Sequence, residues 1–257
     1  MKDLTLDFDM HRQPDNTTCG PACLHAVYDY YDDSIPIKEV ISETANLIEG
    51  GTLAVYLACH ALKRGYQTTI IPYNLQVFDP TWSALSSEEI KKKLQQQLSF
   101  KSHIPGFEVV TSAYIEYLES GGRLRFEVIR PSLIRHYLKR SIPILTGLSA
   151  TYLYDSAREY GTGGDFDYND VRGESNGHFV VLTGYTKEDR RVLIADPLKP
   201  NPIAQSSYYS VEIYRLVCAI MLGILTYDGN LLIIEKTKKN PRRAPRCSGD
   251  HLQRHKI

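Results

Sequence analysis

One of the five cysteines occupies a position where a thiol ionises easily. Cys19 is followed by Gly20 and Pro21, and then by an apolar stretch of helical character that ends near Tyr31. Proline is favoured at the first positions of a helix, where its missing N–H removes no intrahelical hydrogen bond. The spacing therefore predicts a helix that begins at Cys19. At that end, the helix dipole and the free backbone N–H groups favour the thiolate, so Cys19 is the candidate nucleophile.

Two polar residues precede this cysteine. Gln13 lies six residues upstream, and its side-chain amide can donate a hydrogen bond to a developing oxyanion. The backbone N–H of Cys19 would be the second donor. Asp15 either caps the loop before the helix or accepts backbone N–H groups near Gln13, and we favour a structural role for it.

A general base and a residue that orients it are predicted much later in the chain. His178 opens the apolar strand 178–185, and Asp196 closes a second strand, 192–195, beyond a turn at 187–190. If the two strands pair as a hairpin, His178 and Asp196 lie at the same end of it. The other seven histidines fit this role less well, because they lie within predicted helices, in polar connections or in the tail.

A thiol, an imidazole and a carboxylate in this arrangement suit nucleophilic attack on an acyl group. The alternative is that a free cysteine is only a small buried apolar residue. Cys23, Cys59 and Cys218 fit that description, since each lies in an apolar helical setting.

At these residues the sequence resembles the C39 family of cysteine peptidases and its C39-like relatives. The matching pieces are Gln13, Asp15, the run 19–22, the run 178–182 and the run 195–197, in the chain order of papain-like cysteine enzymes. Many family members carry aspartate immediately before the nucleophile, where this chain has Thr18. The chain also lacks an ATP-binding motif, so a leader-peptide substrate is not implied.

The resemblance implies an α+β, papain-like fold in which an N-terminal helical half packs its nucleophile helix on an antiparallel sheet that carries the histidine and the aspartate. It implies a cysteine peptidase acting on a peptide or protein substrate, with no cofactor and no metal. Two alternatives stay open: an acyltransferase or transpeptidase that uses the same acyl-enzyme, and a catalytically silent peptide-binding module.

Composition suggests one large domain and a tail. The chain has 257 residues, is 42% hydrophobic and has a formal net charge of zero. From Lys236 onward, however, eight basic residues face one acidic residue. We therefore expect a C39-like domain over residues 1–235 and a disordered basic tail over 236–257. The tail lacks aromatic residues between its basic ones, which argues against nucleic-acid binding.

The cysteines and the apolar runs predict the cellular compartment. Five cysteines without regular spacing argue against a disulfide framework and a zinc site. The acidic N-terminus lacks a signal-peptide core, and the longest apolar run, 216–225, is too short to cross a bilayer. We therefore expect a cytoplasmic protein without a membrane span. The oligomeric state is left open.

Between the candidate site residues, the pattern predicts helices over residues 37–47, from 53 to about 63, 131–140 and 211–225, and strands over 66–73, 123–129, 142–148 and 231–235. Residues 74–122 read as a helical insertion opened by a capping box at Ser86 and Glu89. Residues 149–177 read as a long loop, rich in tyrosine, aspartate and glycine, that forms a rim beside the site.

Overall fold

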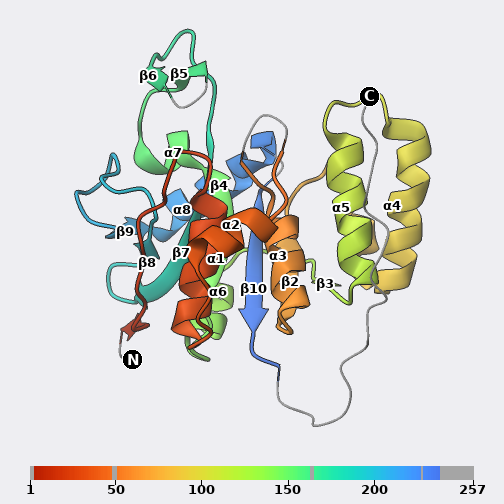
Figure 1. Ribbon diagram of the computed structural model, residues 1–257, viewed down its shortest axis with the longest axis horizontal. Helices are drawn as coiled ribbons and strands as arrows, with labels where there is room; N and C mark the ends of the chain where they lie inside the picture. The colour runs from red at the N-terminus through yellow and green to blue at the C-terminus, as the bar shows by residue number, and fades with distance from the viewer. Residues whose placement is uncertain (1–2, 48–50, 163–164, 227, 238–257) are drawn as a thin grey trace.

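The structure is a computed structural model that describes residues 3–47, 51–162, 165–226 and 228–237. Its centre is a sheet in the order β3-β2-β10-β4-β7-β8-β9 (Figure 1). Strand β1 pairs with residues 184–185 of β7, beyond the part of β7 that pairs with β4. Among the described strands of this sheet, the β2–β3 pair is parallel and the others are antiparallel. The strands are β1 Leu4–Thr5, β2 Gln67–Pro72, β3 Arg123–Leu124, β4 Ile144–Ser149, β7 Gly177–Thr186, β8 Arg191–Ala195, β9 Tyr208–Glu212 and β10 Asn230–Glu235.

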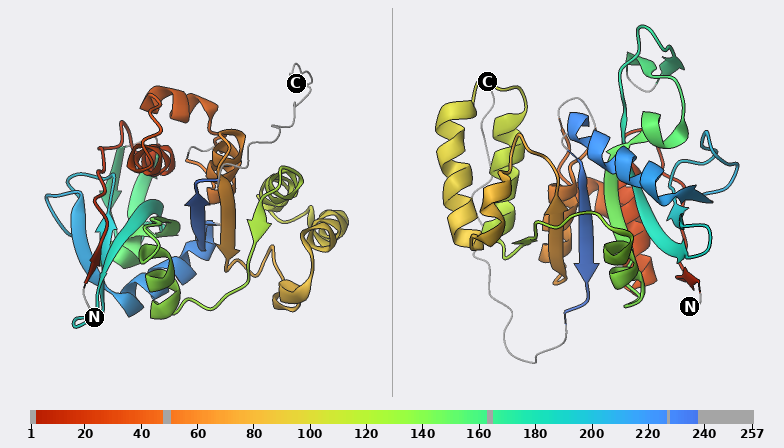
Figure 2. Two further views of the ribbon diagram at one scale, coloured as in Figure 1. Left: turned by 90° about the horizontal axis from the view of Figure 1, so that it is seen from below. Right: turned by 180° about the vertical axis from the view of Figure 1, so that it is seen from behind.

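Helices cover both faces of the sheet (Figure 2). One face carries α1, α2 and α3, and the other carries α6 and α8, while α4 and α5 lie side by side next to α3 (Figure 1). The helices are α1 Cys19–Tyr30, α2 Ile37–Glu43, α3 Ala54–Lys63, α4 Ser87–Lys101, α5 Phe107–Glu119, α6 Pro131–Leu138, α7 Ala150–Tyr154 and α8 Ile213–Leu222; short 3-10 turns are η1 Pro80–Ala84 and η2 Gly223–Thr226.

Strand β7 is buried on both sides, and its side chains alternate between two apolar cores. Phe179 and Val181 pack with the residues of α1 and α3, whereas Val180 and Leu182 pack with those of α6 and α8. This alternation follows from the two-residue period of a strand. It holds β7 between two helical layers, and this strand carries His178 near its start.

The α+β class, the helix that begins at Cys19 and the β7–β8 hairpin are confirmed. Helix α1 packs on the sheet through β7. This is the arrangement expected of a papain-like chain, with a helical N-terminal part against a largely antiparallel sheet.

Several predicted elements are wrong in extent. Residues 149–177 are not one loop, because they contain α7 and the two-stranded hairpin of β5, Glu159–Thr162, and β6, Asp165–Tyr168. The helix predicted over 211–225 starts only at Ile213, since 208–212 form strand β9 on the edge of β8. The helix predicted over 37–47 ends at Glu43, and the strand predicted over 123–129 is only two residues long.

The segment 74–122 holds η1, α4 and α5, and the predicted capping box is present at the start of α4: Ser86 accepts from the Glu89 N–H, and the Glu89 carboxylate accepts from the Ser86 N–H. Whether this segment is an insertion in the domain stays a prediction. The predicted disordered tail falls almost wholly on residues 238–257, which lie outside the described residues.

Gly20 lets α1 approach both α3, with the residues just before it, and strand β7 closely. A Cβ added there would lie 2.6 Å from Thr52 Cγ2 and 3.2 Å from atoms of Leu57 and Phe179. A methyl group in this space would push α1 away from its neighbours, and with it Cys19, the adjacent residue. Glycine at this position is therefore required by packing.

We expect Gly20→Ala to lower the free energy of unfolding by about 1–3 kcal/mol, the usual cost of overpacking a core. Urea unfolding followed by circular dichroism measures it. Gln96→Ala, on the exposed face of α4, is the matched control and should change stability by no more than about 0.5 kcal/mol. Equal effects of the two substitutions would contradict this account of α1 packing.

Candidate active site

Cys19 is the first residue of α1, so its backbone N–H lies outside the intrahelical hydrogen-bond ladder. The first such bond runs from the Ala22 N–H to the Thr18 carbonyl. The preceding turn is fixed locally, because the Asp15 carboxylate accepts hydrogen bonds from the Thr17 N–H at 2.8 Å and from its hydroxyl at 2.7 Å. Asp15 therefore has the structural role that we favoured.

His178 and Asp196 meet at one end of the β7–β8 hairpin. His178 Nε2 lies 2.8 Å from Asp196 Oδ1, and both side chains are buried. The carboxylate fixes the tautomer and the tilt of the ring, because it occupies one of the two ring nitrogens. The Cys19 sulfur acts on the same imidazole and helps to raise its pKa, and Nδ1 is the ring nitrogen that does not face Asp196.

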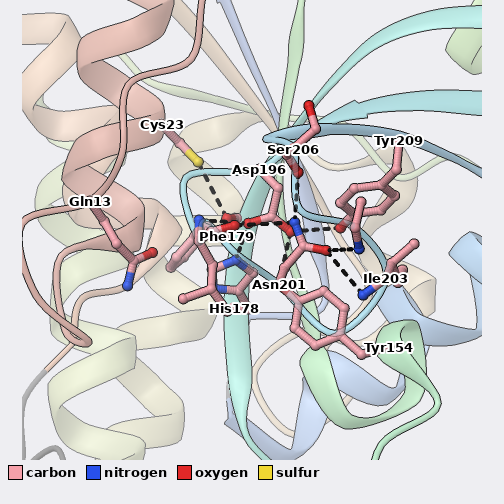
Figure 3. Close-up of polar contacts among 12 residues, drawn as sticks. Gln13, Cys23, Tyr154, His178, Phe179, Asp196, Asn201, Ile203, Ser206 and Tyr209 are labelled. Atoms are coloured by element: carbon pink, nitrogen blue, oxygen red, sulfur yellow. Dashed lines mark hydrogen bonds and ion pairs between the residues drawn. The ribbon is translucent and has the colours of Figure 1, made fainter.

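The Asp196 carboxylate accepts hydrogen bonds from four donors, and two of them come from tyrosines that the sequence did not suggest. Tyr154, at the end of α7, donates to Oδ2 at 2.8 Å, and Tyr209, on β9, donates to the same oxygen at 2.6 Å (Figure 3). Oδ1 accepts from the Leu198 N–H at 2.8 Å as well as from His178. The carboxylate is thus fully satisfied although Asp196 has no exposed surface.

Tyr154 lies in the segment predicted as a loop, and Tyr209 lies just before the helix predicted over 211–225, in no predicted element. No local pattern marks either as a partner of Asp196, and their tyrosine-rich surroundings were the only available signal.

The charges of this cluster support one another. Burial alone would raise the pKa of Asp196, but the charge of His178 and the donated hydrogen bonds hold it below its ordinary value. Burial also opposes the charged form of His178; the Asp196 carboxylate and the Cys19 sulfur outweigh that effect and raise the pKa of His178 to about 10. The imidazole is therefore protonated at neutral pH.

Gln13 lies on the opposite side of His178 from the tyrosines and outside the hydrogen-bond cluster around Asp196 (Figure 3). Its backbone N–H donates to the Pro197 carbonyl at 3.0 Å, which links its loop to the end of β8. Its side-chain Nε2 donates to the Asp15 carbonyl at 2.7 Å, and its Oε1 is buried without a partner among the described residues. The amide nitrogen thus keeps one unused hydrogen.

The remaining cysteines divide into two groups. Cys23 and Cys59 are buried, as predicted, and burial raises the pKa of each thiol. Cys23 also donates to the Phe179 carbonyl at 3.3 Å, which ties α1 to β7. The prediction for Cys218 is wrong: it is exposed, because it lies on the outer face of α8. Cys247 lies outside the described residues.

Among the described residues, no cluster of three histidine, cysteine or acidic side chains is placed to hold a metal ion. No helix within that part of the chain combines the length and the apolar character that crossing a membrane requires.

Solved structures with similar folds cover most of this chain at low identity. A C39-like peptidase from Bacillus anthracis aligns with 93% of this chain and 100% of its own at 14% identity and a TM-score of 0.48. A double-glycine-motif protease from an AMS/PCAT transporter, solved with its leader peptide, covers 92% and 99% at 14% identity and a TM-score of 0.42. Xylellain, a cysteine protease from Xylella fastidiosa, covers 92% and 85% at 15% identity and a TM-score of 0.41.

No curated protein matches the sequence. A family model does match, over residues 130–216, which run from the residue before α6 into α8 and include His178, Asp196, Tyr154 and Tyr209 but neither Cys19 nor Gln13. The matching model is that of the Peptidase_C39 like family, and the match is confined to this segment.

Proposed function

We propose that this chain is a cysteine peptidase that hydrolyses peptide or amide bonds of a peptide or protein substrate. The observation that carries the proposal is the position of His178, whose ring lies 2.8 Å from the buried Asp196 carboxylate and whose charged form is favoured by both that carboxylate and the Cys19 sulfur. A histidine buried for structural reasons alone would need hydrogen-bond partners but no thiol at the start of a helix. The match of residues 130–216 to the Peptidase_C39 like family model supports the same conclusion.

In the proposed mechanism, the raised pKa of His178 keeps the proton on the imidazole, so Cys19 reacts as a thiolate. The thiolate attacks the scissile carbonyl, and His178 gives its proton to the leaving amine. Water, deprotonated by the same ring, then resolves the acyl-enzyme. Asp196 holds the ring in the tautomer that directs the other nitrogen at the thiol.

The oxyanion would be held by the Cys19 N–H and by Gln13. The Cys19 N–H is available because it begins α1. The hydrogen bond from Gln13 Nε2 to the Asp15 carbonyl fixes the amide and leaves its second hydrogen for the oxyanion. Losing one such donor typically costs 10²–10³ in turnover.

Tyr154 and Tyr209 would act as positioning residues. Both keep their protons, because burial and the neighbouring Asp196 carboxylate raise the pKa of each phenol. Two fixed donors on Oδ2 leave Oδ1 to face His178, and so set the direction from which the carboxylate holds the ring.

Cys19 should be the most reactive of the four cysteines that the structure describes. At neutral pH and low reagent concentration, we expect iodoacetamide to label Cys19 far ahead of the buried Cys23 and Cys59, and clearly ahead of the exposed Cys218. Peptide mass spectrometry over time measures the rates, with Cys218 as the ordinary exposed thiol in the same molecule. His178→Gln should slow Cys19 and leave Cys218 unchanged; equal rates for Cys19 and Cys218 in the unaltered protein would rule out an activated thiolate.

Replacing Tyr209 or Tyr154 by phenylalanine removes a donor to the buried carboxylate. We expect each substitution to lower kcat on the order of tenfold with little change in KM, since a hydrogen bond to a charged group is worth about 1.5 kcal/mol or more. Tyr208→Phe is the matched control, because the Tyr208 hydroxyl contacts Met10 and Asp9 instead of Asp196. If all three variants lose turnover equally, or if KM alone changes, the positioning role is wrong.

Hydrolysis should dominate over acyl transfer. An activated peptide ester or amide, incubated with enzyme and a graded concentration of a simple amine, should give mainly the free acid even at millimolar amine. The rate should fall as pH rises through about 10, because His178 then loses the proton that the leaving amine needs. Liquid chromatography with mass detection separates the two products, and Cys19→Ala should abolish both.

An amide product that takes over at low amine concentration would show that the chain is an acyltransferase. Binding of a peptide without either product would favour the silent peptide-binding module.

A further inference from the structure

Helix α8 is apolar on both of its faces. The buried residues of its inner face, which packs on the sheet, are Ile213, Leu216, Ala219 and Ile220. The exposed residues of its outer face are Tyr214, Cys218, Met221 and Leu222. In the right view of Figure 2, α8 lies on the near side of the sheet, and this outer face stays uncovered within the part of the chain that the structure describes. A helix that is apolar all round is normally buried on all sides.

The single charged residue of α8, Arg215, is engaged by α7. Its guanidinium donates to the carbonyls of Leu153 and Tyr152, each at 3.1 Å, and pairs with Asp155 at 3.0 Å. Tyr152 is itself partly exposed, and the neighbouring Cys218 thiol raises the pKa of its phenol. Tyr152 therefore continues the outer face of α8 onto α7. We call the five residues Tyr152, Tyr214, Cys218, Met221 and Leu222 the α8 patch.

The α8 patch has the size of the apolar centre of a protein interface. Tyr152, Tyr214, Met221 and Leu222 are 42, 58, 41 and 40% exposed. At about 200 Å² for a whole large side chain, these fractions leave roughly 350 Å² in contact with water. A stable interface buries about 800 Å² on each partner, and slightly more than half of that area is apolar. The patch thus supplies most of the apolar area that one side of such an interface needs.

The chemistry around the patch argues against two other occupants. The basic segment 238–257 carries only Leu252 and Ile257 as large apolar residues, so it is a poor cover for an apolar helix face. An anionic membrane surface needs basic residues beside the apolar ones. Here the neighbours are Glu212, whose carboxylate caps α8, and Asp155, whose side chain is 85% exposed, while Arg215 is already paired.

The patch is complementary to itself. Tyr214, Cys218 and Leu222 follow one another at intervals of four residues, which is the spacing of the ridges that interlock when two helices pack. Two antiparallel copies of α8 place the Tyr214 end of each helix against the Leu222 end of the other, with Cys218 in the middle. A two-fold axis generates such a contact, because the same surface serves both chains. The formal net charge of zero adds no long-range repulsion between copies.

We propose that the α8 patch binds the α8 patch of a second copy of this chain, about a two-fold axis that passes near Cys218. The inference goes beyond the proposed function and does not depend on it, since no catalytic step enters its test. Because the apolar area is small, we expect a dissociation constant on the order of 10–100 μM. Cys218 is then exposed in dilute protein, as thiol labelling requires.

Sedimentation velocity of the full-length chain under reducing conditions is the first test. From about 1 to 200 μM, the mass should rise from that of one chain, 29.2 kDa, toward twice that value. Met221→Glu and Leu222→Glu should each raise the dissociation constant at least about tenfold, because each buries a carboxylate near the acidic start of the opposing α8. Phe100→Glu is the matched control, since Phe100 is 78% exposed on α4, and it should change the constant by less than about twofold.

A disulfide between the two chains tests the position of the axis. With Cys19→Ala and Cys247→Ser, Cys218 is the exposed thiol that remains, because Cys23 and Cys59 are buried. Diamide oxidises two Cys218 thiols to one disulfide and takes up their two electrons and two protons as it becomes the hydrazine. Peptide mass spectrometry should find the linked Cys218 peptides at about 100 μM protein, and Met221→Glu should lower their yield at least about tenfold.

A mass of one chain over the whole concentration range would overturn the proposal. Equal dissociation constants for Met221→Glu and Phe100→Glu, or equal yields of the Cys218 disulfide, would show that the copies meet elsewhere and overturn it too. Phosphatidylcholine vesicles test the remaining occupant: a chain that stays single and binds them, and loses this binding with Met221→Glu, assigns the patch to a membrane and rules out the second copy.

Discussion

The site depends on one buried anion. Asp196 has no exposed surface, and its carboxylate accepts hydrogen bonds from β7, α7, β9 and its own turn. An ionised carboxylate out of water is costly unless it is paired and fully hydrogen-bonded. The four donors meet that requirement only when all these elements are in place. The contacts that stabilise the Asp196 carboxylate therefore also hold His178 in its orientation.

The charge of Asp196 acts on Cys19 through His178. The Asp196 carboxylate and the Cys19 sulfur together outweigh the effect of burial on the pKa of His178, so the ring is protonated. Helix α1 carries Cys19 and the sheet carries His178, so the packing of α1 on the sheet brings the two together. Two further contacts hold α1 against β7. Gly20 allows α1 to pack closely, and the Cys23 thiol donates to the backbone of β7 at Phe179, next to His178. Packing and electrostatics here constrain the same pair of elements.

Polar contacts also link parts that are distant in sequence. The Pro197 carbonyl, next to Asp196, accepts from the Gln13 N–H, so the proposed oxyanion donor is placed by the same turn that places the carboxylate. Just before β10, the Asp228 carboxylate accepts from the Ala54 N–H at 2.9 Å and caps α3 from a position 174 residues away. The site is thus built on connections across the sheet between distant segments.

The sequence by itself determined the features that depend on local chemistry. Pro21 after Cys19 marks the start of α1, the capping box marks α4, and the apolar runs around the 187–190 turn predict the hairpin that joins His178 to Asp196. Only the tertiary structure decided which residues satisfy the buried carboxylate, where β9 pairs, and that residues 149–177 fold into α7 and a hairpin. Tyr154 and Tyr209 bind Asp196 because the sheet and α7 bring them to it, and no periodicity or capping pattern encodes a contact of that kind.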